Sequence, residues 1–259
     1  MKIGFPTHPR RDPCEEIAWI AANGFDFVDL FLEPDRGTLD GVDVGAVRAA
    51  LDRSGLDVIG HSAWYLPIGS PLPQLRKAGV DIFLQYMDLF DRLGIRAVTI
   101  HANWPGRLFS AEEGVALQVE SLQGIVREAR GRGMEILYEP VPTPLDTPEN
   151  VAAVLDAVPD LKCHLDLGHC QVVDGQPGAM IRRFASRLVH LHAHDNMGDR
   201  DLHLPPGTGT IDWEDVFRAL AEIGFEGTMT LEVFSPEREY AVLAGEIMRR
   251  WIREFGVPH

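Results

Sequence analysis

The chain has 259 residues, a formal net charge of −15 and 45% hydrophobic residues. No apolar run approaches the roughly 18 residues of a membrane span, and the first residues hold no apolar signal-peptide core before Pro6. We therefore expect a cytoplasmic protein without a membrane partner. Because a strongly acidic protein repels the phosphate backbone, we do not expect nucleic acid as a partner either. Cys14, Cys163 and Cys170 lack the spacing of a disulfide framework, so we expect reduced thiols.

Short apolar runs, rich in β-branched residues, predict strands along the whole chain. In chain order they are KIGF (2–5), FDFVDLFL (25–32), LDVIGH (56–61), AVTIH (97–101), MEILYE (134–139), CHLDL (163–167), VHLHAH (189–194) and TMTLEV (228–233). A segment of plausible helical character follows each run. The clearest helical segments, 80–94 and 115–133, both end at a glycine, the residue that a left-handed helix cap favours.

This alternation of strand and helix predicts an α/β protein, and eight such units in a chain of this length match a (β/α)8 TIM barrel. We expect residues 1–259 to form one domain, because no linker, low-complexity tract or change in composition divides them. The main rival is an open doubly wound sheet, which should carry a Gly-rich phosphate turn at its switch point. Since no predicted strand is followed by such a turn, the sequence favours the barrel.

Residues that can bind metal recur at the ends of the predicted strands or in the segments that follow. They are His61, His101, Glu139, Asp166, His169, His192, Asp201, His203 and Glu232. A TIM barrel builds its active site at the carboxyl ends of its strands, so these side chains should meet at one mouth. Burying so many carboxylates and imidazoles together would be very costly without cations. The sequence therefore predicts a site for divalent metal, either Zn(II) or Mn(II).

Taken singly, each of these residues has a plainer interpretation. One histidine at a strand end is more often a hydrogen-bonded structural group, and Glu139 or Glu232 alone could pair with an inner Arg or Lys. Joint placement at one mouth favours metal binding for the set. The two-residue period of a strand puts His190, His192 and His194 on one face. We expect His190 to lie deeper in the barrel and His194 to support the ligands or the substrate from behind.

Three aromatic residues and one acid also follow predicted strand ends and could contact substrate. Trp64 and Tyr65 after the third strand, and Trp104 after the fourth, could supply flat apolar walls for a sugar. Packing between loops at the rim is an equal alternative for all three. Glu33, at the end of the second strand, could contact substrate hydroxyls or form a salt bridge with a helix.

Several longer motifs carry a resemblance to a known group of proteins. LYEP surrounds Glu139, LDLGH contains Asp166 and His169, and HLHAHDN is followed by DLHLPPGTGTIDW. With these motifs the chain, from MKIGF to TLEVF, resembles the xylose isomerase-like TIM barrels. That group includes the sugar phosphate isomerase/epimerase family and the endonuclease IV family of apurinic-site nucleases.

The resemblance implies two different sets of metal ligands, and hence one to three ions. In hexulose epimerases of the group, four side chains hold one divalent ion, and their counterparts here are Glu139, Asp166, His192 and Glu232. The two glutamates of such enzymes also exchange protons with the substrate. In the nucleases nine ligands hold three zinc ions, and all nine candidate residues given above are counterparts. Family members often form dimers, so a homodimer is compatible with the resemblance.

Neither template fits the sequence in every respect. The epimerases have a substrate-contacting Arg in the loop after the seventh strand, where this chain has Asp201-Leu202-His203. The nucleases enter DNA with extended loops, whereas the loops of this chain are short and its charge is strongly negative. A simple transfer of either activity is therefore not justified.

Two enzymatic hypotheses follow. In the first, which we favour, a metal-dependent isomerase or epimerase acts on a small polyhydroxylated carbonyl compound, such as a sugar or sugar phosphate. A metal-stabilised enediolate would form while Glu139 and Glu232 act as general base and acid. In the second, two or three cations activate water for hydrolysis of a small phosphoester. A passive metal- or sugar-binding protein is a weaker third hypothesis, because an open site with many ligands suits catalysis better.

Overall fold

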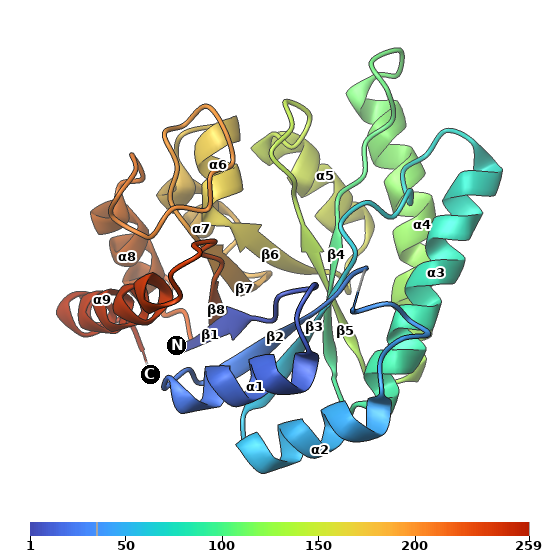
Figure 1. The fold of residues 1–259 in the computed structure, drawn as a ribbon. Coiled ribbons are helices and arrows are strands. Elements are labelled where there is room, and N and C mark those ends of the chain that lie inside the picture. Colours follow the sequence, from blue (N-terminus) through green and yellow to red (C-terminus); the bar gives the residue numbers. More distant parts are fainter. Residues whose placement is uncertain (35, 259) are drawn as a thin grey trace.

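A computed structural model describes residues 1–34 and 36–258, and its parallel strands close into a barrel (Figure 1). Each strand pairs with the next one along the chain, and the last strand pairs with the first. The strands are β1 (Lys2–Pro6), β2 (Phe27–Leu32), β3 (Asp57–Ser62), β4 (Ala97–His101), β5 (Glu135–Glu139), β6 (Lys162–Asp166), β7 (Leu188–Ala193) and β8 (Thr228–Leu231). The predicted (β/α)8 TIM barrel is confirmed.

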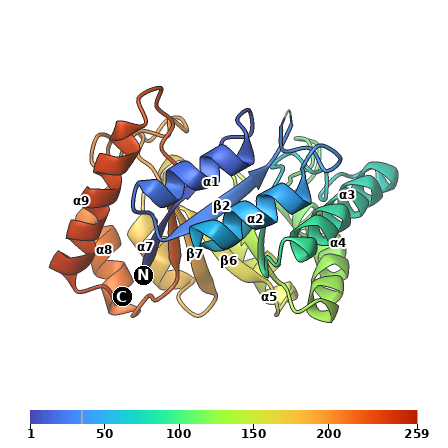
Figure 2. The same cartoon turned by 60° about the horizontal axis from the view of Figure 1, so that its bottom comes forward.

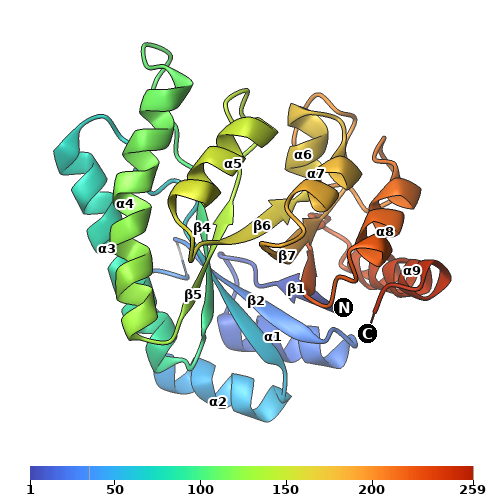
Figure 3. The same ribbon diagram turned by 180° about the vertical axis from the view of Figure 1, so that it is seen from behind.

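Helices surround the strands on the outside of the barrel in all three views (Figure 1, Figure 2 and Figure 3). They are α1 (Pro13–Ala22), α2 (Val44–Ser54), α3 (Pro73–Arg92), α4 (Ala111–Gly131), α5 (Pro148–Ala157), α6 (Leu167–Val173), α7 (Pro177–Arg183), α8 (Trp213–Glu222) and α9 (Glu239–Phe255). A helix follows every strand, as predicted, and two short helices follow β6. None of the described helices is both long and apolar enough to cross a membrane.

The two helices that the sequence predicts most clearly match α3 and α4, but both begin earlier than predicted. Pro73 suits the first turn of α3, where its missing N–H would have no partner, and Ser110 and Glu113 form a capping box at the start of α4. Gly94 and Gly133 have φ angles of 78° and 64°, the left-handed conformation expected after a helix. Each helix begins at its capping residues. These lie before the apolar periodic segment from which the helix was predicted, so the predicted starts were too late.

The inside of the barrel is filled in layers, which β2 illustrates. Alternate residues of a strand point the same way, so Phe27, Asp29 and Phe31 all face the interior. Phe27 packs with Ile59 and Leu137 in an apolar floor. Asp29 occupies the next level, and Phe31 lines a cavity at the carboxyl end of the barrel. Polar side chains therefore begin in the middle of the barrel and continue to its mouth.

Candidate metal centre

The register of the parallel strands sets the predicted metal-binding residues side by side. The Cα atoms of His101 and Glu139 are partners across β4 and β5, and those of Asp166 and His192 are partners across β6 and β7. The predicted run 228–233 placed Glu232 within the last strand. In the structure β8 ends at Leu231, so Glu232 directly follows the strand. Because parallel strands end at the same edge, these side chains converge at the mouth.

At the centre of the group, one imidazole nitrogen lies among three carboxylates. Nδ1 of His192 is 3.0 Å from Oε2 of Glu232, 3.6 Å from Oε1 of Glu139 and 3.7 Å from Oδ2 of Asp166. All four side chains are buried. Oδ2 of Asp166 is buried without a hydrogen-bond partner among the described residues. An unpartnered oxygen beside these other donors fits a divalent cation, whose ligands are carboxylate oxygens and imidazole nitrogens.

A second group adjoins this centre on the side of β3 and β4. Oε2 of Glu139 lies 3.1 Å from Nε2 of His61 and 3.0 Å from Nε2 of His101. The three donor atoms are close enough together to hold one metal ion. Glu139 thus belongs to both groups, and its two oxygens face different histidines.

A third group lies on the side of the long loop between β7 and α8. Oδ2 of Asp201 is 3.4 Å from Nε2 of His169 and 3.1 Å from Nε2 of His203. Oδ1 of Asp201 is 3.3 Å from Nε2 of His194, which also lies 3.0 Å from Oδ1 of Asp166. The structure therefore brings all nine predicted metal-binding residues into three adjoining groups, and His194 joins them.

Two residues of the third group depend on special backbone geometry. A Cβ atom at Gly168 would lie 1.9 Å from Cε1 of His194, so only glycine lets this imidazole approach. His203 has a φ of 49°, the only positive value of a non-glycine residue in the described ranges. Such backbone is unfavourable for a histidine and is often retained at functional sites. Nδ1 of His203 lies 3.1 Å from the carbonyl oxygen of Glu232, which fixes the orientation of the ring.

Beneath the centre lies a carboxylate that the sequence analysis missed. Oδ2 of Asp29 is 2.9 Å from Nε2 of His192 and 3.4 Å from Nε2 of His190, and it accepts a hydrogen bond of 2.8 Å from the hydroxyl of Thr230. His190 lies deeper than His192, as predicted, and its Nδ1 is 2.7 Å from Oγ1 of Thr228. The available signal was an acidic residue inside the apolar run FVDLFL.

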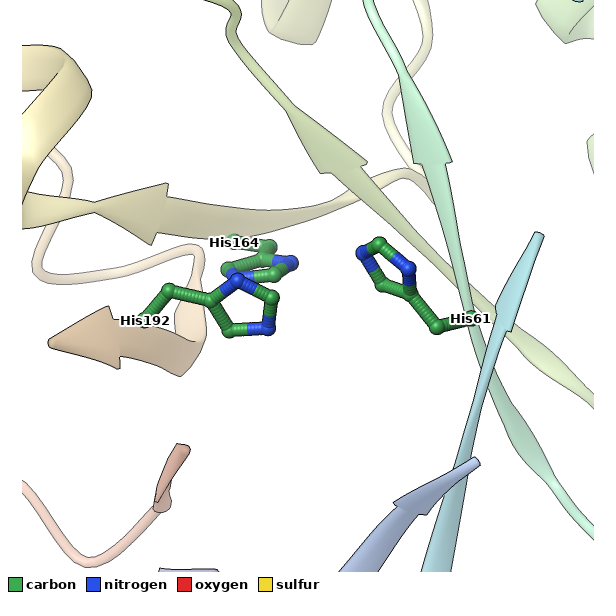
Figure 4. Close-up of side chains that lie close together, drawn as sticks. All are labelled: His61, His164 and His192. Atoms are coloured by element: carbon green, nitrogen blue, oxygen red, sulfur yellow. The ribbon is translucent and has the colours of Figure 1, made fainter. Parts of the chain in front are cut away.

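His164 is the second residue that the sequence analysis did not assign. Its Nδ1 lies 3.3 Å from Oε2 of Glu139 and 3.2 Å from Oγ1 of Thr99. Figure 4 shows His164 with His61 and His192, pointing toward one another from β6, β3 and β7. Its position two residues before Asp166 on the same strand face was the signal that could have identified it.

The electrostatics of the site follow from its mixture of acids and imidazoles. Burial raises the pKa of Glu139, but His101, His164 and His192 outweigh burial and hold it well below its usual range. Burial lowers the pKa of His169, yet Asp166 and the other nearby carboxylates raise it to about 10. Glu139 is therefore ionised and attracts positive charge, which protonated imidazoles or metal ions can supply.

A cavity of ≈ 940 Å³ opens above the three groups and is lined partly by aromatic residues. Phe31 stacks on His61 with ring centroids 3.9 Å apart, and Phe234 stacks on His203 at 4.3 Å. Both phenylalanines line the cavity with Trp64. The sequence analysis named Trp64 but neither phenylalanine.

The other expected substrate contacts are placed differently. Glu33 lines the cavity, whereas its lining includes neither Tyr65 nor Trp104. Nε1 of Trp104 donates a hydrogen bond of 2.8 Å to Oδ2 of Asp146, which turns the indole into the packing between two loops. This position matches the rim-packing alternative for Trp104.

Comparison with known proteins agrees with this architecture. The family model described as xylose isomerase-like TIM barrel matches residues 17–255. The inosose dehydratase of Clostridium beijerinckii is 24% identical over 251 residues, covering 82% of this chain and 81% of that protein. The D-psicose 3-epimerase of Ruminiclostridium cellulolyticum is 23% identical over 231 residues, covering 84% and 77%. The crystal structure of a D-tagatose 3-epimerase-like protein has a TM-score of 0.88 at 23% identity, covering 99% of this chain and 98% of that one. Since the family model spans most of the sequence, the chain belongs to the xylose isomerase-like TIM barrel family.

Proposed function

We propose that this protein is a divalent-metal-dependent isomerase or epimerase of a small polyhydroxylated carbonyl compound, such as a sugar or sugar phosphate. The observation that carries the proposal is the convergence of Glu139, Asp166 and Glu232 on Nδ1 of His192. This arrangement combines metal-binding groups with two carboxylates able to move protons. The names of the two relatives above, an epimerase of psicose and a dehydratase of inosose, support the same class of substrate.

In this proposal Glu139, Asp166, His192 and Glu232 hold the ion. A divalent cation there would polarise the substrate carbonyl and stabilise the negative charge of an enediolate. Glu139 is ionised because its imidazole neighbours hold its pKa low, so its carboxylate can accept the proton from the carbon beside the carbonyl. Glu232 comes from the end of β8, which is not adjacent to β5 in the barrel, and donates a proton from another side. Phe31, Trp64 and Phe234 would pack against the substrate and limit the access of water.

The groups that flank the centre favour a second candidate function, the hydrolysis of a small phosphoester. His61 and His101 adjoin Glu139 on one side, and Asp201 and His203 form a further potential metal group on the other. Two or three ions in these positions could activate a water and neutralise a phosphate. The number of ions bound per chain distinguishes this function from the first.

The first experiment is elemental analysis of protein purified without added metal or chelator. A single zinc or manganese ion per chain, retained in His61→Ala and His101→Ala, would support the four-ligand site and the isomerase proposal. Two or three zinc ions, with loss of metal in those variants, would instead favour hydrolysis and direct the search to phosphoesters.

For Glu232→Gln we expect a fall in turnover of at least about 10²-fold, because the amide cannot transfer the proton. The assay follows interconversion of ketose and aldose substrates by chromatography, and circular dichroism checks the fold. Glu246→Gln, an exposed change on α9, is the matched control and should keep wild-type turnover. Wild-type turnover in Glu232→Gln would refute the assignment of Glu232.

A further inference from the structure

Basic residues gather on one wall of the cavity, although the chain as a whole carries a net charge of −15. The wall consists of His8, Arg10 and Arg11 from the segment between β1 and α1, and Arg238 just before α9. We call these four residues the basic wall. They line the same cavity as His61, Glu139 and Glu232, so one ligand could reach both the basic wall and the metal centre.

Only one arginine of the basic wall is fully engaged in holding the fold together. Arg238 donates to both carboxylate oxygens of the buried Glu16, at 2.8 and 3.1 Å, and its guanidinium lies 3.6 Å from the ring centroid of Trp19. The backbone N–H of His8 donates to the same carboxylate at 3.2 Å. Glu16 therefore already accepts hydrogen bonds from Arg238 and from the backbone of His8, and its negative charge compensates the charge of Arg238.

The remaining two arginines keep their charge available to a ligand. The guanidinium of Arg11 comes no closer to Glu16 than 3.7 Å, measured from its Nη1 to Oε1, and its side chain is 44% exposed. Arg10 is exposed and forms no ion pair with the described residues. Glu237, another carboxylate that lines the cavity, accepts a hydrogen bond from Ser235. Arginine guanidinium groups in this state bind carboxylates and phosphates through paired, charge-assisted hydrogen bonds.

His8 supplies a further donor and reports the local potential. The backbone N–H of Arg10 donates to Nδ1 of His8 at 3.1 Å, so a neutral His8 carries its proton on Nε2. Burial lowers the pKa of His8, and Arg11, Arg10 and Arg238 lower it further against the opposing effect of Glu16. Three arginines and one carboxylate, Glu16, thus act on His8.

We propose that the basic wall binds an oxyanion of the substrate, a phosphate or carboxylate group remote from the carbonyl that the metal centre processes. This inference rests on the proposed function, since it assigns the far end of the same substrate. It makes acidic sugars and sugar phosphates the substrate class, in preference to neutral sugars. The cavity of ≈ 940 Å³ lies near the upper end of the range of about 300–1,000 Å³ for small-molecule sites, and so leaves room for both contacts.

The test compares binding of three matched ketoses to the metal-loaded protein by titration calorimetry. D-fructose is neutral, D-fructose 6-phosphate carries a phosphate and D-fructuronate carries a carboxylate. We expect at least one anionic ketose to bind about tenfold more tightly than D-fructose, the order expected from charge-assisted hydrogen bonds. Tighter binding of the phosphate alone would identify a phosphate subsite, and tighter binding of both would identify a general oxyanion subsite.

Arg10→Gln combined with Arg11→Gln should remove this preference and leave the affinity for D-fructose unchanged. Arg127→Gln, an exposed change on α4, should keep the preference. Both altered arginines are exposed, so the double variant should fold, and thermal melting verifies this. Equal affinities for the three ketoses in the wild type, or a preference that survives in the double variant, would overturn the proposal.

The two proposals can fail separately. Turnover of ketoses without a preference for anions would overturn the oxyanion subsite and leave the proposed isomerase intact. An arginine-dependent preference for anions without turnover of any ketose or aldose would support the subsite and contradict the isomerase.

Discussion

His192 occupies a decisive position, because its two ring nitrogens face different partners. Nδ1 faces the carboxylates of the candidate metal centre, and Nε2 faces Asp29. Burial raises the pKa of Asp29, but hydrogen bonds with His190 and His192 outweigh it and hold the pKa well below its usual range. An ionised Asp29 keeps a proton on Nε2 of His192, which leaves Nδ1 free to bind metal. We therefore propose that Asp29 is a positioning residue for the candidate metal centre.

Asp29→Asn should weaken the binding of divalent metal by about 10–100-fold, because an amide no longer selects the required proton position on His192. Competition between the protein and a chelating dye for Zn(II) or Mn(II) measures this affinity. Asp156→Asn, an exposed change on α5, serves as the control. If the Asp29 variant folds and binds metal as tightly as the wild type, Asp29 has no positioning role.

At the scale of elements, the long loop between β7 and α8 carries Asp201 and His203 and is held by one buried side chain. Oδ2 of Asp195 accepts hydrogen bonds from the backbone N–H of Gly207 and from Nε1 of Trp213, both 2.9 Å long. Its other oxygen accepts from two further backbone N–H groups. These four hydrogen bonds fix the loop that carries the third candidate group.

The loop between β5 and α5 is held by a second buried acid. Oδ2 of Asp146 accepts hydrogen bonds from Trp104, from the backbone N–H of Val141 and from the hydroxyl of Thr143. Val141 and Thr143 line the cavity. Burial raises the pKa of Asp146 from its ordinary 3.8 to about 7. The conformation of this side of the mouth is thus tied to a carboxyl group that titrates near neutrality.

The pH dependence of stability follows from this shift. Between 3.8 and about 7 the unfolded chain has lost the proton of Asp146 while the folded protein keeps it, so the contribution of this group to stability falls as pH rises. Asp146→Asn, which resembles the protonated acid, should therefore gain stability relative to the wild type from pH 5 to 7. The gain should be at most about 1.4 kcal/mol per pH unit, measured by urea unfolding. A constant difference between the two proteins across this range would contradict the prediction.

For the whole molecule, closure of the barrel gathers carboxylates from β5, β6 and β8 at one mouth of an already acidic chain. Neighbouring imidazoles compensate part of this negative charge, and bound cations would compensate more of it. The free energy of unfolding should therefore increase more on metal binding than in a barrel whose mouth is neutral.

Metal should raise the melting temperature, and its removal by a chelator should lower it. At a free metal concentration of about 100 times Kd the expected stabilisation is about 2.7 kcal/mol, or several degrees for a chain of this size. Glu139→Gln should reduce the effect of metal.

We also propose that residues 1–259 form one domain, which predicts a single calorimetric transition with or without metal. Two separate transitions would contradict the single domain, and an unchanged melting temperature on metal addition would contradict the stabilising role.

The sequence by itself determined the barrel, the order of its strands and the end at which the metal-binding residues gather. These features depend on local patterns, since strand periods, turn residues and the residue at each strand end are all adjacent in the chain. Candidate metal-binding residues such as Glu139 and Asp166 could therefore be located from local runs such as MEILYE and LKCHLD, and their recurrence at several strand ends led to the prediction of a metal site.

Only the tertiary structure decided which distant groups meet. It placed Asp29 under His192, directed Trp104 to Asp146 instead of the cavity, and joined Arg10 and Arg11 to Arg238 in the basic wall. The physical reason is that these contacts arise from barrel closure and from loop conformation. Neither produces a periodic pattern of residues that could be recognised in the sequence. Closure sets residues from opposite ends of the chain side by side, and their chemistry then acts as one site.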